Sequence, residues 1–169
     1  MIIAIDGRCA SGKTTLGREL AKKLDCNIIH MDHFFLRPEQ RTAERMAKPG
    51  ANIDYERFLG EVLPHLKAGA AFSYRPFDCQ KQEMGEEIFI KAHDACIVEG
   101  SYSCHPELFD NYDLRIFLSI SADEQMARII RRDGEEYAAV FREKWIPMEE
   151  KYFDVFQIKE RCDLVFDTE

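Results

Sequence analysis

The sequence lacks the features that would place it in a membrane or on nucleic acid. No run of its 169 residues approaches the roughly 18 apolar residues of a membrane span, and no basic, apolar leader precedes Ile2. The 23 Lys and Arg are outnumbered by 31 Asp and Glu, and the net charge of -8 disfavours general electrostatic binding to nucleic acid or an anionic membrane. We therefore expect a cytoplasmic protein with a small-molecule partner. Whether the chain forms a homo-oligomer stays an open question.

The sequence also lacks metal-binding and repeat patterns. Its six cysteines form no Cys-x-x-Cys pair, and its five histidines have no metal-ligand spacing. Neither a zinc site nor a disulfide framework is indicated, so reduced thiols are expected. Internal repeats and low-complexity segments are absent as well. With 46% hydrophobic residues the chain is long enough for one full core, and we expect a single domain over residues 1–169.

One motif dominates what is present. Residues 7–14 read Gly-Arg-Cys-Ala-Ser-Gly-Lys-Thr, which fits the phosphate-binding loop pattern of Gly, four residues, Gly, Lys and Ser or Thr. The apolar run from Ile2 to Ile5 predicts a strand before the loop, and the leucine spacing from Thr15 to Leu24 predicts a helix after it. The motif therefore has the strand, loop and helix context that it needs.

The loop predicts a site for ATP and Mg²⁺. Backbone N–H groups and the positive end of the helix would hold phosphates, Lys13 would reach the outer phosphates as a catalytic residue, and the Thr14 hydroxyl would ligate Mg²⁺. The residues expected to contact the nucleotide here are Gly7, Arg8, Cys9, Ala10, Ser11, Gly12, Lys13, Thr14 and Thr15.

Alternating strands and helices predict an α/β domain with a parallel sheet covered on both faces. The segment from Arg37 to Gly50 reads as a polar loop, and residues 72–77 and 87–91 read as a hairpin. The further strands are expected at Asn27 to Met31, Ala95 to Val98, Leu114 to Ile120 and Leu164 to Phe166. The further helices are expected from Asp54 to Leu66, from Ser121 or Asp123 to Arg132, and from Glu135 to Phe156 with an interruption near Pro147.

Two acidic residues follow predicted strands, at the edge of the sheet where ligands gather. Asp32 is a candidate base that orients the acceptor hydroxyl and takes its proton, or a residue that holds a Mg²⁺-bound water. Glu99 is a candidate for the metal site and for contact with the substrate. The structural alternative is a helix cap or a solvated loop charge for Asp32, and a strand-end charge for Glu99.

Three arginines lie at helical spacing before the breaker Asp133-Gly134. Arg128, Arg131 and Arg132 would share one helix face, which predicts a lid around residues 128–145. Arg128 would contact the nucleotide, Arg131 the substrate, and Arg132 the transferring phosphoryl group. A solvated basic stripe is the alternative, and Arg142 and Lys144 are weaker candidates for the same lid.

Aromatic residues are candidates for the wall of the acceptor site. Phe34 and its neighbour Phe35 follow the second strand, and Tyr74 and Arg75 lie in the predicted hairpin. Aromatic stacking and an arginine hydrogen bond would suit a small polar acceptor. Structural packing is the alternative for all of them.

Taken together, these segments resemble the uridine kinase family of small-molecule kinases, to which nicotinamide riboside, pantothenate and phosphoribulose kinases are related. The resemblance rests on the loop, on Met-Asp-His-Phe-Phe at 31–35, on Ile-Asp-Tyr-Glu-Arg-Phe at 53–58, on Ile-Val-Glu-Gly at 97–100 and on Arg-Arg-Asp at 131–133. It implies a three-layer P-loop NTPase fold with a five-stranded parallel sheet in the order 2-3-1-4-5.

The resemblance also implies roles for single residues. Asp32 matches the family's catalytic Asp, Asp54 the Asp that holds acceptor hydroxyls, and Arg132 the lid arginine; a plain helix cap is the alternative for Asp54. The sequence lacks the family's pyrimidine-reading His motif at residues 74–81 and a second lid Arg-Gly-Arg.

These observations predict a kinase that transfers the γ-phosphoryl group of ATP to a hydroxyl of a small metabolite, a nucleoside first. A vitamin precursor or sugar phosphate is the alternative acceptor. A nucleotide-dependent switch or binding module is the alternative of another class.

Overall fold

The computed structural model describes residues 1–168. Five strands form one parallel sheet in the order β2-β7-β1-β8-β9. If only these five are counted, the order is 2-3-1-4-5, and the predicted fold class is confirmed. The strands are β1 (Ile2–Gly7), β2 (Asn27–His30), β7 (Cys96–Glu99), β8 (Leu114–Ile120) and β9 (Leu164–Thr168).

Two apolar layers cover the sheet, one on each face. On one face α1 (Lys13–Leu24) places Leu16, Leu20 and Ala21 against Ile3 and Ile5 of β1. The other face has the larger layer, which is closed by α3 (Tyr55–Glu61), α4 (Leu63–Ala68), α5 (Pro106–Phe109) and α8 (Ile146–Phe156). Because successive strand residues point to opposite faces, the continuous apolar run of β1 serves both layers.

Asp6 is a buried acid near the end of this apolar strand. Its carboxylate accepts hydrogen bonds from the N–H groups of Gly7 (2.7 Å), Tyr102 (3.1 Å) and Cys104 (2.9 Å) and from the Tyr152 hydroxyl (2.8 Å). Four donors satisfy a group that would otherwise be costly to bury. Asp6 therefore fastens the phosphate-binding loop to the segment after β7 and to α8.

The segment predicted as a loop over residues 37–50 contains short helices. They are the 3-10 turn η2 (Pro38–Gln40) and the helix α2 (Ala43–Ala47), which Thr42 caps by accepting from Arg45 N–H at 3.1 Å. Arg45 then holds α2 in place by donating to the carbonyls of Ala51 and Ile53 and to Glu56. The partners of Arg45 lie 6 to 11 residues further along the chain, and such contacts are not part of the helical spacing from which helices are predicted.

The helix predicted from Asp54 to Leu66 is divided in two. Asp54 is its N-cap, as expected, and accepts from Arg57 N–H at 3.1 Å. The division between α3 and α4 falls at Val62, because Pro64 has no N–H to continue the ladder. Beyond α4, the predicted hairpin consists of two antiparallel pairs, β3 (Phe72–Tyr74) with β6 (Ile88–Ile90) and β4 (Phe77–Asp78) with β5 (Glu83–Met84).

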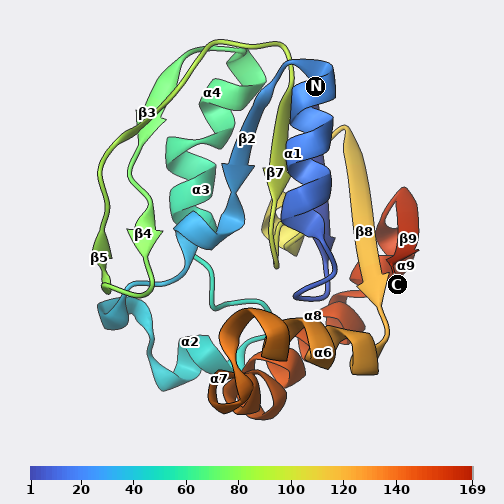
Figure 1. Ribbon diagram of the computed structural model, residues 1–169. Coiled ribbons are helices and arrows are strands. Elements are labelled where there is room, and N and C mark those ends of the chain that lie inside the picture. The colour runs from blue at the N-terminus through green and yellow to red at the C-terminus, as the bar shows by residue number, and fades with distance from the viewer. Residues whose placement is uncertain (169) are drawn as a thin grey trace.

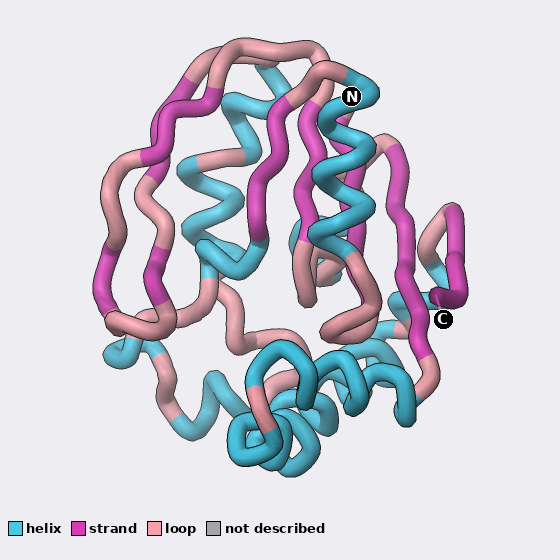
Figure 2. The backbone as a smooth tube through the Cα atoms, viewed as in Figure 1, coloured by secondary structure: helices cyan, strands magenta, loops and turns pink. Residues whose placement is uncertain are grey.

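The C-terminal helices cross below the carboxyl edge of the sheet (Figure 1). Ser121 caps α6 (Ala122–Asp133), and Gly134 separates it from α7 (Glu135–Val140). A π-helical turn, η3 (Phe141–Trp145), precedes α8, so the predicted interruption lies just before Pro147, and α9 (Ile158–Arg161) leads into β9. Figure 2 shows the loops at the lower ends of the central strands, with helices beneath them. In residues 1–168 no helix is long and apolar enough to cross a membrane.

Asp6→Asn tests whether the buried carboxylate holds these segments together. In the asparagine variant, the NH₂ group would face N–H and O–H donors and leave them without an acceptor. We therefore expect the free energy of unfolding to fall by on the order of 3 kcal/mol. Urea unfolding monitored by circular dichroism measures it. Asp113→Asn is the control, because Asp113 also accepts a β1 N–H, that of Ile2, but has a side chain 63% exposed. Equal losses in the two variants would contradict the role given to Asp6.

Candidate active site

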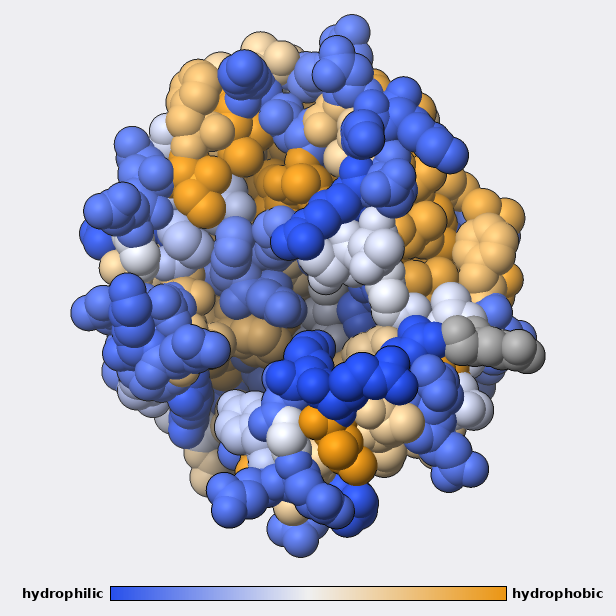
Figure 3. All heavy atoms as spheres, viewed as in Figure 1, coloured by the Kyte–Doolittle hydropathy of each residue, from blue (hydrophilic) through white to orange (hydrophobic). Residues whose placement is uncertain are grey.

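A cavity of about 690 Å³ opens at the carboxyl edge of the sheet, a size that suits small-molecule ligands. The space-filling view in Figure 3 is hollowed between this edge and the helices below it. The phosphate-binding loop, the ends of β2 and β7, the α2 segment, the β4–β5 turn and the lid segment all contribute to its wall. The lining includes Cys9, Ala10, Gly12, Lys13, Thr14, Thr15, Asp32, Phe35, Leu36, Arg41, Asn52, Gln82, Glu99, Tyr102, Arg128, Arg132, Trp145 and Glu149.

The loop has the backbone conformation of an anion cradle. Gly12 precedes α1 at φ +95°, Ala10 has φ +61°, and no side chain caps the first turn of α1. The N–H groups of that turn are therefore available to an anion at the positive end of a 12-residue helix. Gly7 is needed because a Cβ there would lie 2.0 Å from the carbonyl oxygen of Leu118. The arrangement fits bound phosphates.

Lys13 lies folded against its own loop. Its ammonium group donates to the carbonyls of Gly7 (2.7 Å) and Arg8 (2.8 Å), and the residue is buried. An ammonium group has three donors, so Lys13 keeps capacity for a phosphate oxygen while the two carbonyls orient it.

Thr14 and Glu99 come together as a donor set for a hard cation. The Thr14 hydroxyl donates to Glu99 Oε2 at 3.1 Å, and His30 Nδ1 contacts Glu99 Oε1. Among residues 1–168 no group of three or more His, Cys, Asp or Glu side chains is placed to hold a metal ion. The pairing of a hydroxyl with a carboxylate at Thr14 and Glu99 fits Mg²⁺, which proteins often bind through one or two carboxylates together with substrate phosphates and water.

Asp32 lines the cavity beside this pair, at the start of the 3-10 turn η1 (Met31–Phe34). Desolvation by the surrounding walls raises the pKa of its carboxyl, Lys13 opposes that shift, and the charge of Glu99 adds to it. A Cβ on Gly100 would lie 3.3 Å from Asp32 Oδ1, so glycine lets β7 end close to this carboxylate. Asp32, Glu99 and Lys13 line the same cavity, and their roles stay predictions.

The predicted arginine face is only partly directed at the cavity. Arg128 and Arg132 line it, whereas Arg131 lies outside the lining; Arg131 and Arg132 are both exposed. Arg128 Nε donates to Glu124 at 2.8 Å, and Arg132 pairs with Asp133 at 2.7 Å. Two of the three side chains therefore line the cavity, and the substrate contact predicted for Arg131 is not supported.

Comparison with known proteins agrees with this geometry. A shikimate kinase family model matches residues 9–58. A uridine kinase of Brevibacillus brevis is 29% identical over 146 residues, with 80% of this chain and 67% of the relative covered. A chloroplastic uridine/cytidine kinase of Arabidopsis thaliana is also 29% identical, but the matched region covers only 30% of its length. The structure of a possible uridine kinase from Bacillus stearothermophilus matches with a TM-score of 0.74 at 20% identity, covering 99% of this chain and 88% of that one.

The resemblance to uridine kinase-like P-loop kinases is confirmed. The curated uridine kinases support the predicted class of enzyme, a small-molecule kinase whose acceptor group is a hydroxyl. A kinase of this type implies use of a nucleotide. The individual site residues and the acceptor stay predictions.

On the acceptor side of this kinase-like site, the structure does not place three predicted contacts in the cavity. Phe34 is fully buried, stacks on Tyr74 and packs edge-on against Phe58, so it belongs to the core. Tyr74 is buried beside it and hydrogen-bonds His33 at 2.9 Å. Arg75 donates to carbonyls of its own hairpin. The neighbouring Phe35 lines the cavity instead.

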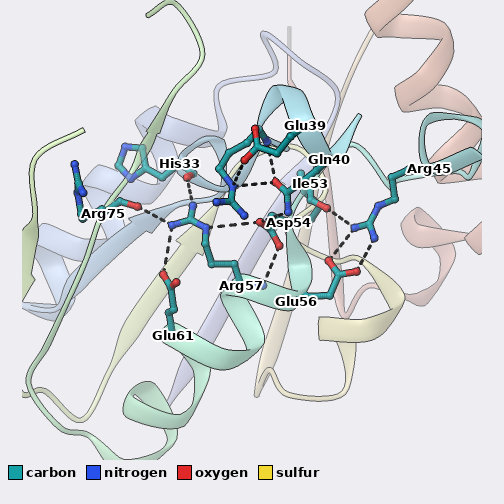
Figure 4. Close-up of polar contacts among 11 residues, drawn as sticks. His33, Glu39, Gln40, Arg45, Ile53, Asp54, Glu56, Arg57, Glu61 and Arg75 are labelled. Carbon is teal, nitrogen blue, oxygen red and sulfur yellow. Dashed lines mark hydrogen bonds and ion pairs between the residues drawn. The ribbon is translucent and has the colours of Figure 1, made fainter. Parts of the chain in front are cut away.

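Asp54 is occupied by protein partners. Its Oδ1 accepts from Arg57 N–H, and its Oδ2 accepts from Gln40 at 2.8 Å, within a network that ties η2 to α3 (Figure 4). The residue is 4% exposed and does not line the cavity. The structure therefore favours the alternative reading, a structural helix cap, over a contact to acceptor hydroxyls.

Several lining residues were missed by the sequence analysis. Arg41 and Asn52 come from the segment around α2, and Gln82 comes from the β4–β5 turn. Arg41 and Gln82 donate to the nearby carbonyls of Leu36 and Cys79, and no sequence motif marks these residues as ligand contacts. Glu149 had a detectable signal, because it shares the buried face of α8 with Tyr152 and Phe153, and an acid on such a face is unusual.

Glu99→Gln tests the metal site. The amide keeps the size of the side chain but removes the charge beside the Thr14 hydroxyl, so the Mg²⁺ concentration for half-maximal activity should rise by about 10- to 100-fold. Mg²⁺ titrations of ADP release measure it. Thr14→Ser retains the hydroxyl and should stay near the unmodified protein. An unchanged Mg²⁺ requirement in the Glu99→Gln variant would remove Glu99 from the metal site.

Proposed function

We propose that the chain transfers the γ-phosphoryl group of ATP to a hydroxyl of a small metabolite, with Mg²⁺ as the metal, and that the first acceptor to consider is a nucleoside. The observation that supports this most is the convergence of the phosphate-binding loop, the Thr14–Glu99 pair and Asp32 on one cavity. Donors for phosphate, ligands for a metal and a base for a hydroxyl are the parts that phosphoryl transfer requires.

The chain's own groups supply positioning and charge. Loop N–H groups and Lys13 would hold the phosphates, and Thr14 with Glu99 would hold Mg²⁺. When bound, that ion neutralises charge on the phosphate oxygens. Arg132 would stabilise charge on the transferring group from the lid side.

Asp32 would act on the acceptor. We propose that it accepts the hydroxyl proton as the phosphoryl group is transferred. The raised pKa of its carboxyl makes it a better proton acceptor than an ordinary aspartate. A role in holding a metal-bound water is the alternative.

A nucleoside acceptor is proposed because the relatives named above are uridine and uridine/cytidine kinases. Phe35 and Leu36 offer an apolar wall near Asp32. The same wall would suit other small acceptors, so the chemistry of the site does not select a base.

Arg41 favours a second class of acceptor, one that bears a phosphate or carboxylate. It lines the cavity, donates Nε to the Leu36 carbonyl at 2.9 Å and lies over the Phe77 ring at 5.9 Å. No ion pair of Arg41 is found in the described part of the chain, 1–168. A sugar phosphate would supply its partner.

A screen of ADP release decides between these acceptors. Uridine and cytidine, other nucleosides, riboside vitamins, hydroxy acids and sugar phosphates are each added to protein with ATP and Mg²⁺. Release that depends on one acceptor identifies it. Release stimulated by none of them would count against the proposal and favour a nucleotide-dependent switch.

Asp32→Asn tests the proposed base. The amide keeps the shape but cannot accept the proton as a carboxylate does, so acceptor-dependent ADP release should fall by about 100-fold or more. ATP affinity measured by calorimetry should change little. Partial recovery at high Mg²⁺ would assign Asp32 to the metal site, and full activity would remove it from the mechanism.

Arg132→Ala tests the lid arginine. Because its charge acts mainly on the transition state, kcat should fall by about tenfold or more while the KM for ATP changes less. Arg131→Ala, one residue away but outside the cavity lining, is the matched control and should leave both constants near their original values. A rise in KM alone would make Arg132 a ground-state nucleotide contact.

A further inference from the structure

A carboxylate of the helix α8 is hydrogen-bonded to the backbone of the phosphate-binding loop. Glu149 is 3% exposed, and its Oε2 accepts from Cys9 N–H at 3.0 Å. Its Oε1 accepts from the Ser101 hydroxyl at 2.8 Å. The side chain lines the same cavity as Lys13, so a negative group already uses one N–H of a loop whose N–H groups would hold a nucleotide phosphate.

The next residue along α8, Glu150, also contacts the loop, through the side chain of Arg8. Glu150 pairs with the Arg8 guanidinium at 2.7 Å, and Arg8 also donates to the carbonyl of Ile120. That contact lies on side chains, whereas Glu149 acts on the loop backbone itself. The two neighbouring acids therefore have different roles. Glu150 anchors the loop through Arg8, and Glu149 faces the cavity.

The charged and titratable groups around Glu149 lie on α1, on β1, in the phosphate-binding loop and in the segment after β7. Lys13 of α1 lies near enough to stabilise its charge, while Asp6 of β1 acts against that charge. Cys9 of the loop and Tyr102 after β7 are neutral neighbours, and both feel the negative charge of Glu149. Burial raises the pKa of the Glu149 carboxyl, and Lys13, the Cys9 N–H and the Ser101 hydroxyl oppose that shift.

A nucleotide phosphate would bring several negative charges against this carboxylate, with Lys13 as the nearby cation that both would need. Like charges at short range disfavour each other strongly where water is excluded. We propose that Glu149 is a built-in competitor of the nucleotide phosphate in the loop, and that it takes up one proton from solvent when ATP binds. This inference rests on the proposed use of ATP.

Protonation would preserve the local structure. The Cys9 N–H continues to donate to Oε2, while a proton on Oε1 is donated to the Ser101 hydroxyl oxygen, whose own hydrogen turns away. The loop therefore keeps its shape while the charge disappears. A glutamine at this position can make the same two contacts, which makes it a close mimic of the protonated acid.

Glu149→Gln tests the inference by calorimetry with Mg·ATP and the whole chain. Titrations at pH 8 in buffers of different ionisation enthalpy measure the protons taken up on binding. We expect the unmodified protein to take up close to one proton more than the variant. The variant should bind ATP about tenfold more tightly at pH 8, and this advantage should shrink as the pH falls and Glu149 protonates in the unmodified protein.

The control is Glu150→Gln, which removes the adjacent charge of α8 but leaves Glu149 in place. It should keep the proton uptake of the unmodified protein. Titration of the nucleotide itself is common to all three proteins and cancels in the comparison. Ser101→Ala is a second variant, because loss of a hydroxyl that stabilises the ionised form should move the fall in ATP affinity to higher pH.

Equal proton uptake and parallel affinity profiles in the Glu149→Gln variant and the unmodified protein, with both binding ATP, would overturn the competitor role and leave the kinase proposal intact. Weaker binding by the variant would also overturn it, because Glu149 would then assist the nucleotide. Absence of ATP binding in every protein would overturn the proposed function together with this inference.

Discussion

The position of the phosphate-binding loop depends on the buried carboxylate of Asp6, which does not itself line the cavity. Asp6 is fully buried and collects four hydrogen bonds from three segments that are far apart in sequence. One of the donors is Gly7, the first residue of the phosphate-binding loop, and another is Tyr152 of α8. Such a group is costly to bury and is tolerated only when all its partners are present. The hydrogen bonds of Asp6 therefore fix the position of the loop and also hold α8 to the sheet.

Because α8 is fixed at Tyr152, its preceding turn faces the loop. A residue three positions earlier lies on the same helix face, which brings Glu149 to the Cys9 N–H, and the adjacent Glu150 reaches Arg8. The π-helical turn η3 joins this anchored helix to the lid segment. The predicted lid would therefore bend at η3 and Gly134 while α8 stays in place, since irregular turns between helices are where such motion is absorbed.

How far the sequence predicts this structure depends on the range of the interactions involved. The loop, the five strands and the caps at Asp54 and Ser121 follow from patterns within a few residues, and the structure has them as expected. The choice between Phe34 and Phe35 does not follow from such patterns. Both are aromatic and adjacent, and only the packing of Phe58 and Tyr74 decides that the first enters the core and the second faces the cavity.

The same argument explains why the phosphate side was easier to predict than the acceptor side. The phosphate side is one continuous stretch whose glycines and helix start are readable in sequence. The proposed acceptor side is assembled from Phe35, Arg41, Asn52 and the β4–β5 turn, which lie on separate short segments of the chain. Asp54 shows the consequence, because a motif residue expected at the substrate is already bound to Gln40 and Arg57. On the proposed function, acceptor specificity would thus reside in the part of the chain where local sequence constrains structure least.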